Sequence, residues 1–253
     1  KIGEPYRAID AWTAARRLDP GSVEALGALV DLLEETSQAH HAAEALGELE
    51  AVLPTIEERR DAYVRLADIL GGPLARVLDA AAALNTALDL DPMHVSAFAR
   101  LEKLLFEARQ FAALEENYHR MIRRLPKEQV KARAIVWRSL AELYLRVLEN
   151  EDGARVAYEV VLKLEPKATD VALSLAAICT KKKETAPKVL ELYHRLASEV
   201  DDPAIPVRHL FELYHALDLR DRMLCSLGAL LLMRAGTKDE VRVYEMLLAR
   251  TPA

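Results

Sequence analysis

Apolar side chains recur at spacings of three and four residues along almost the whole chain, and nowhere do they alternate with polar residues for long. This spacing places them on one face of an α-helix. Gly and Pro fall almost entirely between the amphipathic runs, where Pro ends one helix and allows the next to begin. The pattern predicts an all-α protein made of short amphipathic helices, with no β-strand.

The prolines between these runs repeat at intervals of 34, 38, 34 and 40 residues, at positions 20, 54, 92, 126 and 166. Apolar residues stand 12, 8 and 5 positions before each of them, and we call each such set a triad. The triads are Ala8, Trp12, Ala15; Ala42, Leu46, Leu49; Ala80, Leu84, Ala87; Leu114, Tyr118, Met121; and Ala154, Tyr158, Val161. Spacings of four and three put each triad on a single helix face. A repeat of two-helix units is therefore predicted.

A second set of positions lies in the helix that precedes each triad. It reads Tyr63, Leu66, Ala67, Leu70 in one unit and Trp137, Leu140, Ala141, Tyr144 in another. Together the two sets resemble the tetratricopeptide repeat, a helix–turn–helix unit of about 34 residues. The resemblance implies an α-solenoid, a right-handed superhelix of antiparallel helix pairs. It also implies a concave groove lined by the first helix of each unit.

We expect a single array over residues 1–253. Its predicted parts are the second helix of a truncated repeat at 1–22, repeats at 23–56, 57–94, 95–128, 129–168, 169–203 and 204–236, and a terminal helix at 237–253. The extra residues after Pro54 and Pro126 predict extended first helices in those units. Thr237 followed by Glu240 predicts a capping box.

The outermost helices lack one neighbour each, so they need polar cover or contact with additional sequence. Ile2, Tyr6 and Ile9 are candidates for such a face on the opening helix. Because the predicted array opens inside a repeat, the chain is expected to be part of a longer protein. Further repeats of that protein are one expected partner.

Composition narrows the class of protein. Hydrophobic residues make up 51% and charged residues 29%, and 34 Lys+Arg against 40 Asp+Glu give a net charge of −6. That balance is typical of an ordered protein and argues against nucleic-acid binding, which requires a surplus of cations. The most apolar run, near Leu224–Met233, is about half the roughly 20 residues of a membrane helix, so no membrane insertion is expected.

Two further expectations come from composition. Cys179 and Cys225 lie in apolar helical surroundings and are predicted to be buried free thiols. A cytoplasmic location is expected, and the abundance of Ala, Arg and Leu indicates a bacterial origin.

Catalytic motifs are absent from the sequence. It holds no glycine-rich nucleotide loop, no G-x-S-x-G, no H-E-x-x-H and no C-x-x-C, and Gly71-Gly72 is predicted to form a turn. No nucleophile, base and oxyanion donor come together along the chain. We therefore expect no enzymatic activity, no cofactor and no metal site.

The family resemblance instead implies the binding of a protein partner, as a peptide or a helix, by groove-facing side chains of the first helices. The predicted groove residues include Asp31, Glu34, Glu35, Arg65, Asp68, Arg100, Lys103, Phe106, Arg138, Glu142, Arg146, Lys181, Arg208 and His209. Arg100, Arg138 and Arg146 are expected to receive acidic groups of the partner. The Asn of the carboxylate clamp found in co-chaperone members is missing, so that mode of binding is disfavoured.

Two alternatives stay open. Residues 154–159, with Arg155 and Glu159, resemble the second helix of half-a-TPR repeats, which occur in RNA-maturation proteins. The other alternative is a structural spacer, whose helices would contact only other parts of a longer protein.

Overall fold

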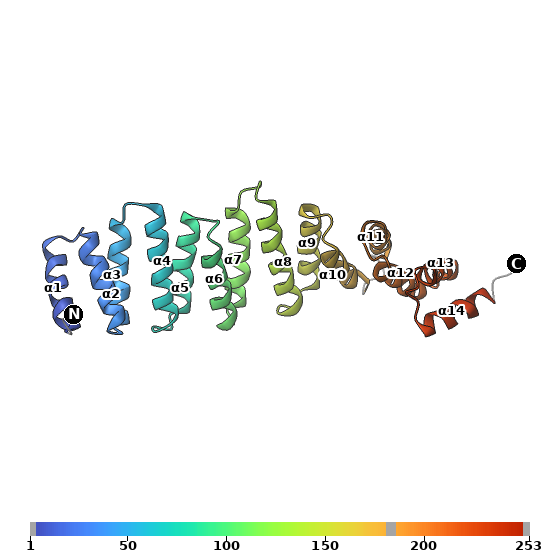
Figure 1. Cartoon of the computed structure of the whole chain (residues 1–253), viewed down its shortest axis with the longest axis horizontal. Helices are drawn as coiled ribbons and strands as arrows, with labels where there is room; N and C mark the ends of the chain where they lie inside the picture. The colour runs from blue at the N-terminus through green and yellow to red at the C-terminus, as the bar shows by residue number, and fades with distance from the viewer. Residues whose placement is uncertain (1–3, 181–185, 250–253) are drawn as a thin grey trace. The chain divides into compact units, whose positions relative to one another are not determined.

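The structure, a computed structural model, describes residues 4–180 and 186–249, which form fourteen helices and no strand (Figure 1). The all-α prediction is therefore confirmed. The chain divides into two compact units, residues 1–126 and 127–253, and each unit is considered by itself.

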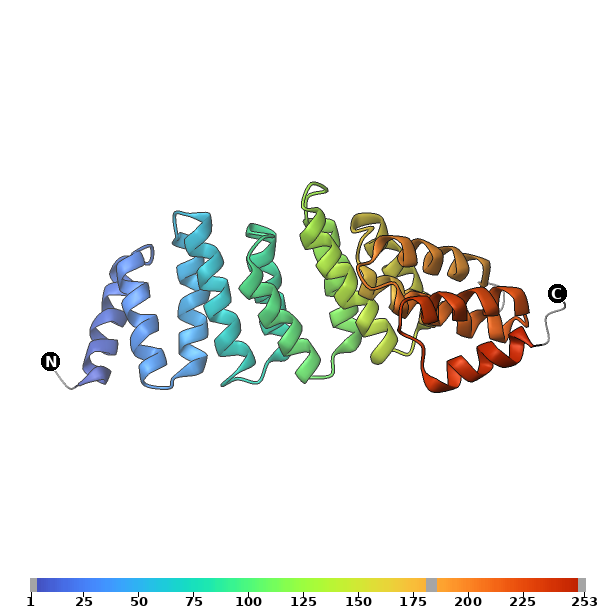
Figure 2. The same cartoon turned by 45° about the vertical axis from the view of Figure 1, so that its right-hand side comes forward.

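In both units, consecutive helices pack against each other in chain order. The first unit contains α1 (Pro5–Leu18), α2 (Val23–Glu35), α3 (Ala39–Val52), α4 (Ile56–Gly71), α5 (Val77–Leu90), α6 (Val95–Glu107) and α7 (Phe111–Arg124). These seven lie side by side from α1 to α7 in both views (Figures 1 and 2). The second unit contains α8 (Val130–Arg146), α9 (Glu151–Leu164), α10 (Thr169–Thr180), α11 (Ala186–Glu199), α12 (Ala204–Ala216), α13 (Arg220–Leu232) and α14 (Lys238–Leu248). Even-numbered helices are the first helices of the pairs, and odd-numbered helices are the second.

The recurring prolines set the ends of the second helices. Helices α1, α3, α5, α7 and α9 each end two residues before one of them. The residue before a proline is sterically pushed out of the helical conformation. Leu53 and Leu125 accordingly have ψ angles of 133° and 127°. A capping box then starts α4, where Thr55 and Glu58 exchange hydrogen bonds.

The triads are buried as their spacing predicted. All three residues are buried in each of α3, α5, α7 and α9, with Tyr158 and Ala154 only 1% and 0% exposed. In α1, which packs against α2, none of the described residues is fully buried. The first helices that follow Pro54 and Pro126 are extended, as predicted. Helix α4 has 16 residues and α8 has 17, whereas α2 and α6 have 13.

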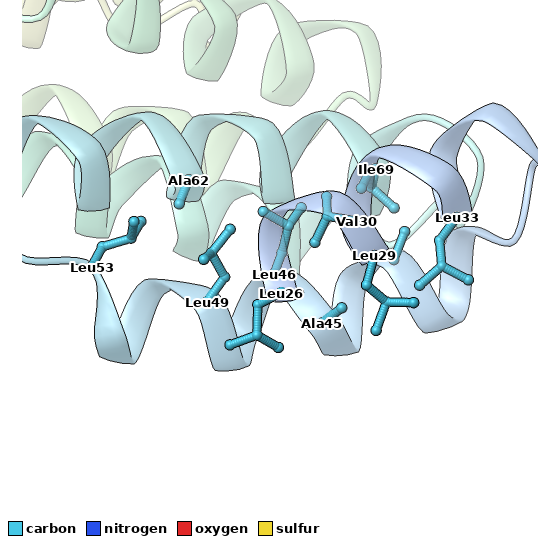
Figure 3. Packing of buried hydrophobic residues seen from close by; sticks show 11 residues of the cluster. Leu26, Leu29, Val30, Leu33, Ala45, Leu46, Leu49, Leu53, Ala62 and Ile69 are labelled. Carbon is cyan, nitrogen blue, oxygen red and sulfur yellow. The ribbon is translucent and has the colours of Figure 1, made fainter. Parts of the chain in front are cut away.

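The core around α2, α3 and α4 shows how neighbouring helix pairs cover each other's apolar faces. Leu26 and Leu29 of α2 pack on Leu46 of α3, and Ile69 of the next unit covers the same cluster (Figure 3). A buried leucine contributes roughly 1.5–3 kcal/mol, so stability in such a stack comes chiefly from these contacts.

The opening helix departs from the expectation of an uncovered face. Ile9 packs against the core cluster of α2 and α3, whereas Tyr6 is 66% exposed. Ile2 lies outside the described residues. The face of α1 toward α2 is thus part of the core.

The prediction for the cysteines was half wrong. Cys179 is buried, but Cys225 of α13 is exposed. None of the helices in the described part of the chain combines the length and hydropathy needed to span a lipid bilayer.

Candidate partner-binding surface

In the first unit, arginines on the first helices reach the carboxylates of the neighbouring first helix. Arg65 of α4 donates from Nε to Glu34 Oε1 at 2.7 Å and from Nη2 to Asp31 Oδ1 at 2.6 Å, both on α2. Arg100 of α6 forms an ion pair with Asp68 of α4 through Nη1 alone. The planar guanidinium suits such two-point contacts with carboxylates.

The second unit repeats this arrangement. Arg138 of α8 pairs with Asp170 of α10, and its Nη2 lies 3.7 Å from Glu165 Oε2. Arg208 of α12 donates from Nε to Glu240 Oε1 of α14 at 2.8 Å, and from Nη2 to the Ala235 carbonyl at 2.6 Å. Apart from the looser contact of Arg138 with Glu165, these ion pairs join residues 31 to 34 positions apart, with a separation of 32 in three of them. Each of them therefore connects one repeat to the next.

The electrostatics of the ion pairs follow from their partners. The hydrogen bond with Glu34 raises the pKa of Arg65. Burial alone would raise the pKa of Glu240, but its hydrogen bonds with Arg208 and Thr237 lower that pKa below its ordinary value. Pairs this exposed typically contribute about 0–1 kcal/mol each. Their main effect is to orient the guanidinium groups on the surface.

A second recurring contact links the two helices of one helix pair. Tyr118 of α7 donates its hydroxyl to Glu102 Oε1 at 2.8 Å, and Tyr158 of α9 donates to Glu142 Oε1 at 2.6 Å. Both pairs are 16 residues apart. Burial raises the pKa of Glu102 and of Tyr158. The predicted groove residue Glu142 therefore also has a structural contact, and its Oε2 forms an ion pair with Arg146 Nε at 2.5 Å.

Among the predicted groove residues, Asp31 and Arg65 lie together, and Arg100, Arg138, Arg146 and Arg208 each pair with a carboxylate of the chain itself. Sequence reasoning missed this pairing. It assigned no partner to Asp68, Asp170 or Glu240, although the 32-residue interval between Arg and an acidic residue is visible in the sequence.

The other predicted groove residues have looser surroundings. Lys103 Nζ lies 3.9 Å from Glu107 Oε1, and the half-exposed ring of Phe106 meets Phe111 edge-on at 5.8 Å. His209 stacks on Tyr193 with ring centroids 5.3 Å apart, while Glu35 is exposed. Lys181 lies outside the described residues.

A pocket of about 400 Å³ opens beside the first of these ion pairs. Glu34, Arg65 and Asp68 supply its charged wall, and Ile69 and Pro73 supply apolar surface. The pocket therefore combines charged and apolar lining. No group of three or more His, Cys, Asp or Glu side chains in the described residues is arranged to hold a metal ion.

Comparison with known proteins finds structures of similar fold but no protein related in sequence. No family model matches the chain, and no curated protein matches it. The structure of Naa15/Naa10 bound to HypK-THB aligns at a TM-score of 0.57 and 14% identity, over 98% of this chain and 37% of the other. The present chain therefore spans little more than a third of that protein.

Two further structures align at a TM-score of 0.48. One is the C-terminal part of a TPR repeat-containing protein from Cytophaga hutchinsonii, 14% identical over 94% of this chain and 93% of the other. The other is YrrB, described as a TPR protein with an unusual peptide-binding site, 13% identical over 75% of this chain and 95% of the other. The helix pairs that pack in chain order, together with the alignment to the Naa15 structure, support the tetratricopeptide-like solenoid fold that the repeat pattern predicted.

Proposed function

We propose that the chain is a non-catalytic scaffold whose first helices bind a segment of a partner protein. The observation that carries this proposal is the recurrence, in both units, of oriented Arg–carboxylate pairs along the first helices. A surface that presents charges at a fixed interval suits an extended segment with its own charges at intervals. The Naa15 structure, which has this fold, was obtained with HypK bound.

Exchange of ion-pair partners provides the binding step. The side chains of Arg100 and Arg138 are 47% and 36% exposed, so a carboxylate of the partner can replace Asp68 or Asp170 without uncovering a buried charge. The intramolecular pair holds each guanidinium in place beforehand, which lowers the entropy lost on binding. Arg146 and Lys103 are more exposed and receive acidic groups directly.

Acidic and aromatic groups extend the same surface. Asp31 and Glu35 accept basic groups of the partner beside Arg65, in the region of the 400 Å³ pocket. Phe106 is half-exposed, and the ring of His209, held by stacking on the buried Tyr193, is partly exposed, so both offer flat surface of the kind common at interaction sites.

The test is a photo-cross-linking experiment on the full chain. Benzoylphenylalanine replaces Phe106 of α6, and in a matched control it replaces Leu78 of α5, which is also more than half exposed but lies on a second helix. We expect a defined protein adduct from position 106 that is absent at position 78. The proposal is wrong if both positions give the same adducts or neither gives any.

A charge-reversal variant tests the electrostatic part. Arg138→Glu with Arg146→Glu should abolish the adduct while the circular dichroism of the helices stays unchanged. Retention of the adduct would remove these two arginines from the binding surface.

An RNA partner ranks below a protein partner. Arg155, which carries the resemblance to RNA-maturation repeats, donates to Glu159 Oε1 at 2.7 Å within α9. Its charge is thus neutralised by the chain, whose net charge is −6. Salt-sensitive binding of single-stranded RNA by the purified chain would reverse this ranking.

Additional helical repeats provide a second candidate partner. The described residues of α1 and α14 include none that is fully buried, and Leu18 and Met246 are exposed. Another repeat stacked on either helix would cover such side chains. Protection of α1 and α14 from hydrogen exchange in a longer chain, but not in this one, would support stacking.

A further inference from the structure

A groove in the second unit lies between two second helices, away from the ion pairs described above. Helix α12 forms its floor with Val207, Leu210 and Tyr214, spaced three and four residues apart. One wall comes from α11 and the other from α13. The hollow has a volume of about 520 Å³, within the range of roughly 300–1,000 Å³ that is common for ligand pockets.

Small side chains keep this groove open. Ala197 lies on the α11 wall, and Cys225, Ser226 and Ala229 lie on one face of α13. The corresponding gap between second helices α5 and α7 is filled instead, because Asn85 bonds to Asn117 at 2.6 Å and Arg124 lies across them. The contrast shows that this fold can close such a gap with larger residues, which the α11–α13 groove lacks.

The groove has an apolar floor and a cationic rim. Arg222 is exposed, and its guanidinium carbon lies 5.7 Å from the centroid of the Tyr214 ring. No ion pair of Arg222 with a carboxylate occurs among the described residues, and Arg222 is the one permanently charged side chain that lines the hollow. His194 adds a polar edge, since its Nε2 lies 2.7 Å from the Tyr214 hydroxyl.

We propose that the α11–α13 groove binds a protein segment that presents an apolar side chain flanked by carboxylates. The apolar side chain lies on Val207 and Leu210, and a flanking carboxylate pairs with Arg222. Aspartate or glutamate next to phenylalanine or leucine satisfies both requirements, whereas a basic segment is repelled by Arg222. The residues that line this groove are not among those assigned to the first-helix surface, and the proposal does not depend on the function proposed for that surface.

Cys225 allows binding to be measured directly, because it is exposed in the groove while Cys179 is buried. The full chain is treated with iodoacetamide, an uncharged reagent, and alkylation of Cys225 is followed by mass spectrometry. The probe is a capped five-residue peptide with phenylalanine flanked on each side by two glutamates. At about ten times its dissociation constant it should slow alkylation about tenfold, since only unoccupied protein reacts.

Three matched changes make the test specific. A peptide with alanine for phenylalanine and one with lysines for glutamates should each protect Cys225 far less. Arg222→Glu should reverse the preference, so that the lysine peptide protects and the glutamate peptide does not. Arg220→Glu serves as control, because Arg220 lies on the same helix, pairs with Asp218 and does not line the groove.

The proposal is overturned if the glutamate and lysine peptides protect the wild-type chain equally, or if neither protects it. An equal effect of Arg220→Glu and Arg222→Glu would also overturn it, because protection would then depend on general charge. Should Arg222→Glu fail to fold by circular dichroism, Arg222→Gln replaces it, with loss of discrimination between the two peptides as the expected result.

Discussion

Asn85 of α5 donates from Nδ2 to Oδ1 of Asn117 on α7 at 2.6 Å, and both side chains are buried. Each amide also donates to a carbonyl one turn earlier in its own helix, Ala81 for Asn85 and Ala113 for Asn117. Arg124 completes the cluster by donating to the side chain and the backbone of Asn85. Two second helices of the first unit are thereby joined through polar groups inside the core.

This contact should be measurable as a coupling energy. In a double-mutant cycle of Asn85→Ala and Asn117→Ala, we expect a coupling of about 1 kcal/mol in the free energy of unfolding, the net value of one hydrogen bond. Urea unfolding of the full chain provides the measurement. A cycle of Asn117→Ala with Thr86→Ala is the control and should be additive, because the exposed Thr86 hydroxyl bonds only within α5. Additivity in both cycles would contradict the prediction.

The tyrosine of the fifth triad, Tyr158, tests the packing register. Tyr158 is 1% exposed and donates to Glu142. Tyr158→Ala should cost about 3–5 kcal/mol of unfolding free energy through the cavity it leaves. Tyr158→Phe keeps the ring and should cost only about 0.5–1.5 kcal/mol for the lost hydrogen bond. Equal losses for the two variants, measured by thermal unfolding, would show that the ring is not in the core.

Alkaline pH should destabilise the chain. Burial, together with Glu50, raises the pKa of Tyr63 to about 12, and burial, together with Glu212, raises the pKa of Tyr193 to about 12. The unfolded chain releases these protons near pH 10, while the folded chain retains them to about pH 12. Stability is therefore full below pH 10 and falls between pH 10 and 12. Tyr63→Phe should show a smaller drop in the urea midpoint from pH 9 to pH 11 than the wild type.

Glu240 should control the attachment of α14. It closes the capping box with Thr237 and pairs with Arg208. Glu240→Gln should cost about 1–2 kcal/mol of local stability and speed hydrogen exchange in α14. Asp239→Asn is the control, since the adjacent Asp239 is exposed and pairs only loosely with Arg242 at 3.5 Å. Equal exchange in the two variants would argue against the role of Glu240.

Because of Glu240, we also expect α14 to lose stability at acid pH. The folded pKa of Glu240 lies below its unfolded value, so its contribution is present above the unfolded pKa and is lost as the pH falls through the folded pKa. Hydrogen exchange in α14 of the wild type should therefore rise toward acid pH, relative to the rest of the second unit. The rise should be absent in Glu240→Gln.

The sequence was sufficient for the elements that depend on local spacing. Proline positions and triads predicted where α3, α5, α7 and α9 end and which residues they bury, because both follow from the helix period and from proline sterics. The capping box at Thr237 is equally local and is confirmed.

Contacts between helices depend on packing that no single segment specifies. Arg123 is exposed and Arg124 is nearly covered, yet the two are adjacent in the same basic run. Cys225 is exposed because the side chains around it in the groove are small. A pattern of hydrophobic positions along the sequence does not show which side chains face each other across a groove. The Arg–carboxylate pairs needed knowledge of which first helices are neighbours and how they are offset.

The extended first helices show where this architecture accepts added length. The first core position, Tyr63 or Trp137, lies seven residues after the start of α4 or α8, whereas Leu26 and Phe98 lie three residues after the start of α2 and α6. The difference of four residues is close to one helical turn of 3.6 residues, added at the amino end. An insertion there leaves every inward-facing side chain of the helix in place, whereas the same four residues inside a triad would move part of it about one turn along the helix axis, away from its packing partners. Repeats of this kind can therefore grow at one rim, turn by turn, without repacking their interior.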